Sequence, residues 1–223
     1  MVVKQKNLER KKLVKDLFTA IANGNKNKLI KLIKKGADVN SRYPYPFSRE
    51  TYQFTPLHFL ACYDDGDEEE IAKILLKHGA NINAGVPPVG RTPLHIAVVF
   101  NNIKMIKSFI KNSANVNAKT QKLKFIPLHD AIFSCNEKIA KILIGSGSNL
   151  NSRIFDGATS LHFAVSRCKS IKLVKWMVEK GVNIFAKDNQ GETALQYAIE
   201  LKDGKMIDYL SKREKELSKK QNK

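Results

Sequence analysis

The chain has 223 residues, of which 43% are hydrophobic, and this is enough for a packed core in one or two globular units. Its apolar runs are far shorter than the roughly 18 residues that a membrane-spanning helix needs, and its first residues lack the apolar core of a signal peptide. With 39 Lys and Arg against 21 Asp and Glu, the net charge of +18 bears on solubility and on partners, not on the fold. We therefore expect a protein that works inside a cell.

A short motif recurs along the chain at a nearly constant spacing. Its marker leucines, from Leu57 to Leu195, are 37, 34, 33 and 34 residues apart. The five copies of this motif, the first reading Thr-Pro-Leu-His, lie at residues 55–58, 92–95, 126–129, 159–162 and, in weaker form, 193–196. A second motif of the type Gly-Ala-Asn-Val-Asn keeps the same period, at 36–40, 79–83, 113–117, 147–151 and 181–184. Two independent motifs in one register indicate tandem repeats.

Each period predicts two short helices followed by an extended finger. A Thr-Pro pair opens the first helix, because the hydroxyl can cap it and proline loses no hydrogen bond in the first turn. In the third period we expect helices over 94–100 and 103–111, the second with apolar residues at helical spacing. The glycine that ends a second helix, such as Gly36 or Gly79, supplies the left-handed conformation of a C-cap. One such unit cannot bury its apolar face alone, so the units must stack.

This pattern resembles the ankyrin repeat, whose unit of about 33 residues carries a Thr-Pro-Leu-His-x-Ala helix start. The resemblance covers residues 17–210 and implies an all-α repeat solenoid of about six stacked helix-turn-helix repeats with short β-hairpin fingers. We predict one continuous solenoid domain. Its parts are an N-terminal helix and capping repeat at 1–40, a repeat with a long aromatic finger at 41–83, repeats at 84–117, 118–151 and 152–187, and a C-terminal capping repeat with a basic tail at 188–223.

Two segments depart from the period. The first finger is longer than the next and aromatic, at 41–54, and the turn within the second repeat is enlarged into an acidic run at 64–70. Insertions in repeat proteins fall in loops, often on the binding side. The acidic run could hold a cation or a basic partner segment, although it lacks the spacing of a calcium loop. A solvated loop is the interpretation that we prefer.

Polar residues at repeated positions are interpreted as structural. Four histidines share one register, but helices pack about 8–10 Å apart, whereas zinc ligands lie about 2 Å from one ion. We therefore expect these imidazoles, His58, His95, His129 and His162, to bond the backbone of adjoining turns. Asp130 breaks an apolar position and either caps a finger amide or receives a partner's cation; we prefer the cap.

No pattern in the sequence carries metal or catalytic chemistry. The three cysteines cannot pair off completely and form no cluster with metal-ligand spacing. There is no nucleophile elbow, phosphate-binding glycine loop, HExxH motif or spaced carboxylate pair. We expect no enzyme, no metal and no cofactor.

The family resemblance implies a concave surface built from the finger tips and the exposed end of each first helix. The finger supplies the residues three and five before the marker leucine, and the helix supplies those five and six after it. These positions are mostly aromatic or aliphatic, and apolar area rimmed by charge marks an interaction site. The candidates are Tyr43, Tyr45, Tyr52, Phe54, Tyr63, Val89, Arg91, Phe100, Leu123, Phe125, Phe133, Phe155 and Arg167, fringed by Arg42, Lys119, Lys122, Lys124, Arg153 and Lys187. The alternative is that some of these rings pack between fingers.

We predict a non-enzymatic protein–protein interaction module whose groove, centred on repeats two to four, binds one protein partner. Apolar anchors would supply affinity, and Arg and Lys would steer an acidic partner. The rival hypothesis is nucleic-acid or phosphate binding through the Lys-rich second helices, although A+T-biased coding would give the same Lys, Asn and Ile excess. We expect a monomer with no membrane partner.

Short ankyrin-like chains of this composition are similar to those of intracellular bacteria and large DNA viruses. The resemblance implies a pathogen or viral effector, or an inhibitor, that acts on a host protein. Its place would be the cytoplasm of the host cell, with the nucleus as a second possibility.

Overall fold

A computed structural model describes residues 2–44, 52–63 and 66–221 of the chain. Tyr45 therefore lies outside the described residues. Internal contacts divide the chain into two compact units, Met1–Gln121 and Lys122–Lys223, hereafter unit 1 and unit 2. Each unit is built from helix pairs, and each is described by itself.

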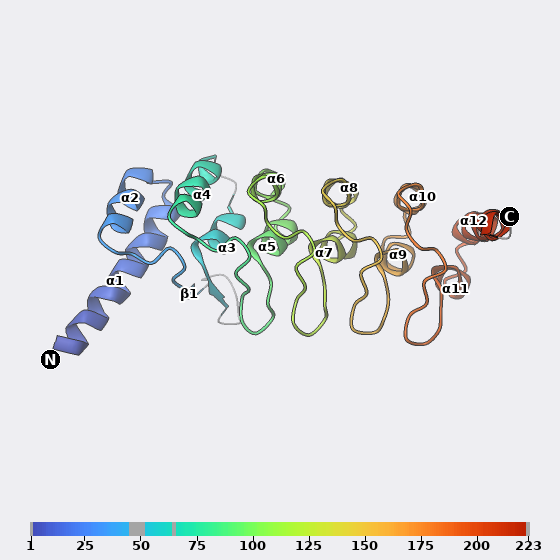
Figure 1. Ribbon diagram of the computed structural model, residues 1–223, viewed down its shortest axis with the longest axis horizontal. Helices are drawn as coiled ribbons and strands as arrows, with labels where there is room; N and C mark the ends of the chain where they lie inside the picture. The colour runs from blue at the N-terminus through green and yellow to red at the C-terminus, as the bar shows by residue number, and fades with distance from the viewer. Residues whose placement is uncertain (1, 45–51, 64–65, 222–223) are drawn as a thin grey trace. The chain divides into compact units, whose positions relative to one another are not determined.

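The described residues of unit 1 form three helix pairs and one short strand pair. Figure 1 shows the helices. The strands β1 and β2 are antiparallel, with Tyr43 opposite Phe54. Helix α3 packs against both α1 and α5, and α4 packs against α6. The elements are α1 Val2–Ala22, α2 Lys26–Lys34, β1 Tyr43–Pro44, β2 Gln53–Phe54, α3 Pro56–Ala61, α4 Glu68–Lys77, α5 Pro93–Val99 and α6 Ile103–Lys111.

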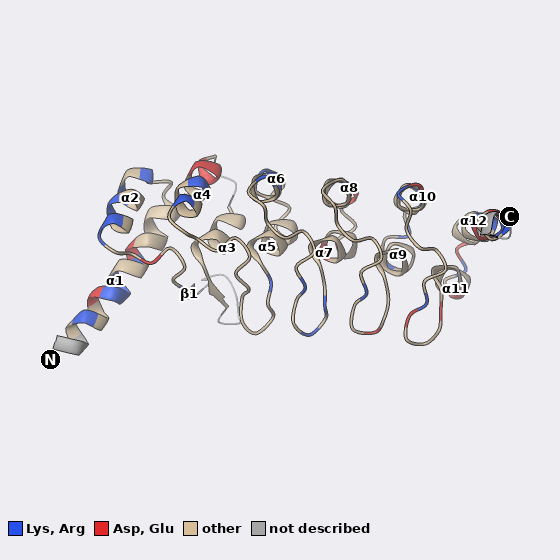
Figure 2. Ribbon diagram, in the orientation of Figure 1, with Lys and Arg blue, Asp and Glu red and all other residues tan. Residues whose placement is uncertain are grey.

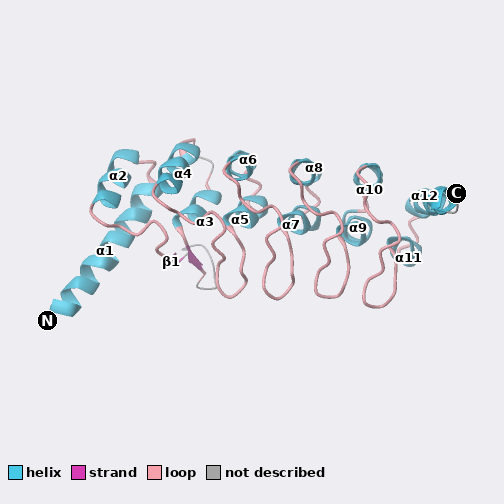
Figure 3. Cartoon of the chain, viewed as in Figure 1, coloured by secondary structure: helices cyan, strands magenta, loops and turns pink. Residues whose placement is uncertain are grey.

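Unit 2 contains three further helix pairs. Its α9 continues directly into a π-helix, η1, and both α9 and η1 pack against α7. Figure 3 shows that a long loop joins α8 to α9, as another joins α4 to α5 in unit 1. The elements are α7 Pro127–Phe133, α8 Glu137–Gly145, α9 Ser160–Phe163, η1 Ala164–Cys168, α10 Ile171–Glu179, α11 Ala194–Glu200 and α12 Gly204–Gln221.

The predicted fold class, an all-α repeat solenoid, is confirmed by these repeated helix pairs. Helices α5 and α6 agree with the predicted 94–100 and 103–111 to within one residue. Gly36 and Gly79 have φ of 90° and 86° after their helices, the left-handed geometry expected of a C-cap. The fingers carry little strand: besides β1 and β2, the described residues show single bridges from Val86 to Arg91 and from Arg153 to Thr159.

The described part of the acidic run, residues 66–70, is largely helical and not a solvated loop. Within its described part, Glu68, Glu69 and Glu70 form the first turn of α4, where carboxylates are favoured by the positive end of the helix dipole. The Glu68 side chain is buried, and its two carboxylate oxygens accept from the Gly66 amide at 3.0 Å. The start of a helix, not a loop insertion, explains this cluster of acids.

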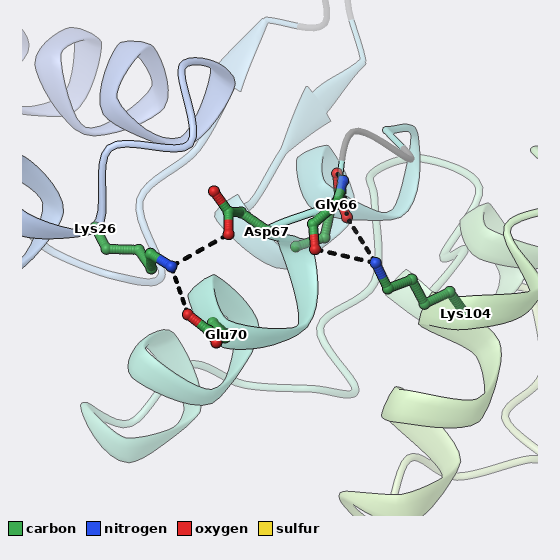
Figure 4. A network of polar contacts seen from close by, with 6 residues as sticks. Lys26, Gly66, Asp67, Glu70 and Lys104 are labelled. Atoms are coloured by element: carbon green, nitrogen blue, oxygen red, sulfur yellow. Dashed lines mark hydrogen bonds and ion pairs between the residues drawn. The ribbon is translucent and has the colours of Figure 1, made fainter.

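Lysines from the neighbouring repeats of unit 1 pair with this acidic helix start (Figure 4). The Lys26 Nζ, at the start of α2, lies 3.1 Å from Asp67 and 2.5 Å from Glu70. The Lys104 Nζ, on α6, lies 3.9 Å from Glu68 and donates to the Gly66 carbonyl at 3.0 Å. The chain's own lysines thus form ion pairs with these carboxylates, in place of the external cation that the sequence left open.

Within each unit, buried histidines tie a repeat to the finger of the next, as the sequence predicted for His58, His129 and His162. The His58 Nε2 lies 3.0 Å from the Arg91 carbonyl, and its Nδ1 lies 2.7 Å from the Thr55 hydroxyl. Since a carbonyl only accepts, Nε2 must carry the ring proton, and Nδ1 accepts from the hydroxyl. In unit 2, His129 and His162 make the same Nε2 contact with the carbonyls of Ser152 and Glu192, at 3.2 and 3.0 Å.

We expect acid to destabilise the protein through His58. Burial lowers the pKa of its imidazole from 6.5 to about 4, so the folded chain excludes a proton that the unfolded chain binds. This contribution is complete above pH 6.5 and is lost as the pH falls toward 4. Through His58, the free energy of unfolding should therefore fall by about 2 kcal/mol between pH 7.5 and pH 5.

Urea unfolding at the two pH values measures this difference, and the NMR signal of the His58 ring should not titrate between them. His58→Gln should reduce the pH dependence without abolishing it, because burial also lowers the pKa of His162. The control His78→Gln, at an exposed position, should leave it intact. An unchanged slope in His58→Gln would contradict the assignment.

Candidate functional site

Two finger tips of unit 2 present neighbouring apolar side chains to solvent. Phe155 is 62% exposed and Leu123 is 44% exposed. The Phe155 amide donates to the Leu123 carbonyl at 3.2 Å, which holds the two tips side by side. In turn Asn189, on the next finger, donates from its backbone to the Asp156 carbonyl at 2.9 Å. The row of tips is therefore fixed by backbone hydrogen bonds.

The ends of the first helices in unit 2 bring an aromatic ring and a cation together. The Arg167 Cζ lies 4.1 Å from the centroid of the Phe133 ring, which is 46% exposed. A guanidinium over a ring face gains a cation–π attraction and keeps its in-plane N–H groups for an acceptor such as a carboxylate. Beside it, burial and the thiol of Cys135 raise the pKa of Cys168 to about 12, so Cys168 adds no charge at neutral pH.

Phe125 belongs to the core and not to the surface. Its side chain is 8% exposed and packs with Ile154 and Ala158, and its ring meets Phe163 edge to face at 5.6 Å. The prediction that Phe125 binds a partner is therefore wrong, because the ring turns inward between two fingers. Leu123, two residues before Phe125 and nearer the finger tip, is exposed. We call Leu123, Phe133, Phe155 and Arg167 the unit 2 face.

Basic side chains border the unit 2 face. Arg153 is held between fingers, since its guanidinium donates to the carbonyls of Gly157, at 2.9 Å, and Lys187. Lys122 and Lys124, on either side of Leu123, are exposed. The exposed apolar side chains at these tips thus stand among basic side chains.

In unit 1 most of the predicted rings pack against the chain itself. Phe54 is 3% exposed, so the prediction that it contacts a partner is wrong. The half-buried Tyr43 stacks on Phe18 with centroids 5.1 Å apart, and the half-buried Tyr63 lies 4.8 Å from Phe59. The long aromatic finger therefore serves in part to cover the N-terminal helix pair.

The other unit 1 candidates are half-buried or contribute through their backbone. Tyr52, Val89 and Arg91 are half-buried. The Val89 carbonyl accepts from the Gln121 amide at 2.9 Å, while the Arg91 carbonyl accepts from His58. Phe100, 43% exposed at the end of α5, is the predicted unit 1 residue that presents the most ring surface among those described.

Two exposed residues were missed in the sequence although the register could have found them. Val99 and Leu201 are 47% and 40% exposed, and they lie five and six residues after their marker leucines.

Asp130 is only 6% exposed, which places its carboxylate out of reach of a partner's cation.

Among the described residues, no group of three or more His, Cys, Asp or Glu is arranged to hold a metal ion. Within the same residues, none of the helices is long and apolar enough to cross a bilayer.

A family model for ankyrin repeats, three copies to the model, matches residues 17–120, 83–154 and 128–221. The chain belongs to the ankyrin-repeat family. Ankyrin repeats indicate a protein–protein interaction module, and such modules are typically non-enzymatic. The resemblance seen in the sequence is thereby confirmed over nearly the whole chain.

The ankyrin-repeat chain is also similar to a curated viral protein. A segment of 51 residues is 41% identical to the "I-Kappa-B like protein G2" of Microplitis demolitor bracovirus (isolate Webb). The match covers 23% of this chain and 30% of the viral protein. This chain thus spans less than a third of that relative.

Two alanine variants should separate core from surface in the ankyrin repeats of unit 2. Phe125→Ala should destabilise by about 3 kcal/mol, because it leaves a cavity beside Phe163. Phe155→Ala should change stability by less than about 0.5 kcal/mol. Urea unfolding checks both, and a large loss in Phe155→Ala would show that this ring is also core.

Proposed function

We propose that this ankyrin-repeat protein binds a protein partner on the unit 2 face and has no enzymatic activity. The observation that carries the proposal is the exposure of Phe155, 62%, on a finger tip whose backbone is bonded to the tip beside it. A large apolar side chain held rigidly in solvent loses little conformational freedom on binding. Well-buried aromatic and Arg anchors supply about 2 kcal/mol or more each at interfaces.

The charges around the face favour an acidic partner. Lys122, Lys124 and Arg153 border the apolar patch, and the guanidinium of Arg167 lies over Phe133. Opposite charge across an interface speeds association more than it tightens the complex. The apolar residues would therefore set the lifetime of the complex, and the cations would set its rate of formation.

In unit 1 the same proposal rests on Phe100, with Val99 beside it. Both side chains are exposed at the end of α5, at positions that the repeat does not need for its own packing. Tyr52, Tyr63, Val89 and Arg91 would contribute their half-exposed edges. We propose the binding residues of each unit separately, without joining them into one surface.

We further propose that the protein acts as an inhibitor or effector against a host protein, in the cytoplasm or nucleus of the host cell. The similarity to a viral protein described as I-Kappa-B like supports this role. A module without chemistry of its own can inhibit by covering the surface that its partner needs for another contact.

Nucleic-acid binding remains the second candidate because exposed lysines lie on the second helices. Figure 2 shows Lys and Arg along α2 and α10, and Lys28, Lys31 and Lys34 are exposed. Several others are engaged within the chain: Lys26 and Lys104 pair with the acidic start of α4, and Lys175 lies 5.5 Å over Tyr209. Phosphate-dominated binding falls steeply with salt, whereas capture by apolar anchors should persist.

Affinity capture from host-cell extract tests the proposal with the full chain as bait. A partner of the unit 2 face should be retained at high salt and should be lost, by more than about tenfold, from the Phe133→Ser/Phe155→Ser variant. The matched control is Ile199→Ser, which removes another exposed apolar side chain outside the face. Quantitative mass spectrometry reads out the difference.

The proposal fails if the double variant and the control retain the same proteins. It fails in favour of the second candidate if the retained material is nucleic acid that elutes at moderate salt.

A further inference from the structure

A cleft of about 790 Å³ opens in unit 1 between the N-terminal half of α1 and the first finger. Its walls come from α1, through residues such as Arg10, Val14 and Lys15, and from the finger, through residues such as Arg42 and Tyr43. The start of α1 extends past the helices that pack on its second half (Figure 1). The volume falls within the roughly 300–1,000 Å³ of typical ligand sites. The unit 2 face does not include any of these residues.

Cations dominate the walls of the cleft. Arg10, Lys11 and Lys15 of α1 are exposed and line it, against the carboxylate of Asp38. Lys11 and Lys15 are four residues apart on one helix face, where like charges repel. An anion in the cleft would relieve that repulsion, so the charge pattern selects a negatively charged ligand.

One cation of the cleft is fixed in place. The Arg42 guanidinium donates to the Gln53 carbonyl and to the Gly85 carbonyl, both at 3.0 Å. Both acceptors are neutral, and no ion pair to Arg42 is formed within the part of the chain that the structure describes. The cleft therefore keeps a preset positive charge on the finger side, opposite the flexible lysines of α1.

The cleft also has an apolar part, which discriminates among anionic ligands. Val14, Tyr43 and Pro44 line it, and Tyr43 is held by its stacking on Phe18. One face of the tyrosine ring packs on Phe18, and Val14 and Pro44 lie in the lining with it, so this wall suits an apolar side chain. An acidic peptide with an apolar side chain matches these groups better than a phosphodiester chain.

We propose that this cleft is a second docking surface, which binds an acidic segment of a protein partner. Carboxylates of the segment bond to Arg10, Lys11 and Lys15, and an apolar side chain packs on Val14 and Tyr43. The surface lies on the N-terminal cap of the repeats and shares no residue with the unit 2 face. Its failure and the failure of the proposed function are therefore distinguishable.

Fluorescence anisotropy with the full chain tests this docking surface. The probe is a labelled short peptide of alternating Glu and Leu, compared with the charge-reversed peptide of Lys and Leu. We expect the acidic peptide to bind, and Arg10→Glu/Lys15→Glu to weaken it by at least about tenfold. The matched control is Lys31→Glu/Lys34→Glu, which makes the same charge change at exposed positions of α2 outside the cleft and should alter affinity less than about threefold.

A second variant tests the apolar part. Val14→Ala should weaken the peptide several-fold at high salt, where long-range charge effects are screened. Circular dichroism checks that the variants fold, which the exposure of Arg10 and Lys15 favours. In the Phe133→Ser/Phe155→Ser background, Arg10→Glu/Lys15→Glu should still weaken the peptide by at least about tenfold, because the cleft shares no residue with the unit 2 face.

Three outcomes would overturn the inference. The first is that the native chain does not bind the acidic peptide. The second is that the two charge-reversed double variants lose affinity equally, which means that only net charge matters. The third is that a labelled oligothymidylate binds as tightly as the peptide and depends on the same residues. The last result would make the cleft a nucleic-acid surface.

Discussion

The hydrogen bond from a buried imidazole to a carbonyl of the next finger is the constraint on which the remaining structure depends. It joins His58 to Arg91 in unit 1, and His129 to Ser152 and His162 to Glu192 in unit 2. A buried donor without its acceptor costs about 1–3 kcal/mol, so neighbouring repeats of a unit are held to one register. That register fixes where each finger tip lies. The side-by-side tips of Leu123 and Phe155 are a consequence of it.

The helices and caps could be predicted from the sequence because their causes are local. A Thr-Pro pair, an apolar stripe and a terminal glycine act within one turn, and α5 and α6 appear where those signals place them. The histidine contacts could also be predicted, since a repeat brings equivalent residues to equivalent places. The long acidic run could not, because its partners Lys26 and Lys104 come from other repeats, and their reach depends on packing.

The candidate site was predicted only in part, and the reason is the alternation of an extended finger. Successive side chains point to opposite sides, so the residue three before a marker leucine turns inward. Phe54 and Phe125 hold that position and are buried. The residue five before the leucine points to the same side of the finger. It lies nearer the tip, however, where less of the neighbouring finger covers it. Leu123 holds this position and is exposed. Whether a side chain of the finger stays exposed to a partner therefore depends on how near it lies to the tip, and not on its residue type.

The charge of the chain acquires a physical interpretation from this arrangement. A net charge of +18 repels itself and adds nothing to folding, and only part of it is neutralised by pairs such as Lys26 with Glu70. Exposed cations nevertheless border the apolar residues of the unit 2 face and line the cleft of unit 1. Coding bias would scatter lysines without regard to apolar neighbours. On the proposed surfaces, by contrast, cations lie beside the exposed Leu123 and Phe155 in unit 2 and beside the half-buried Val14 and Tyr43 in unit 1, where they would attract an acidic partner that the apolar side chains then hold by burial.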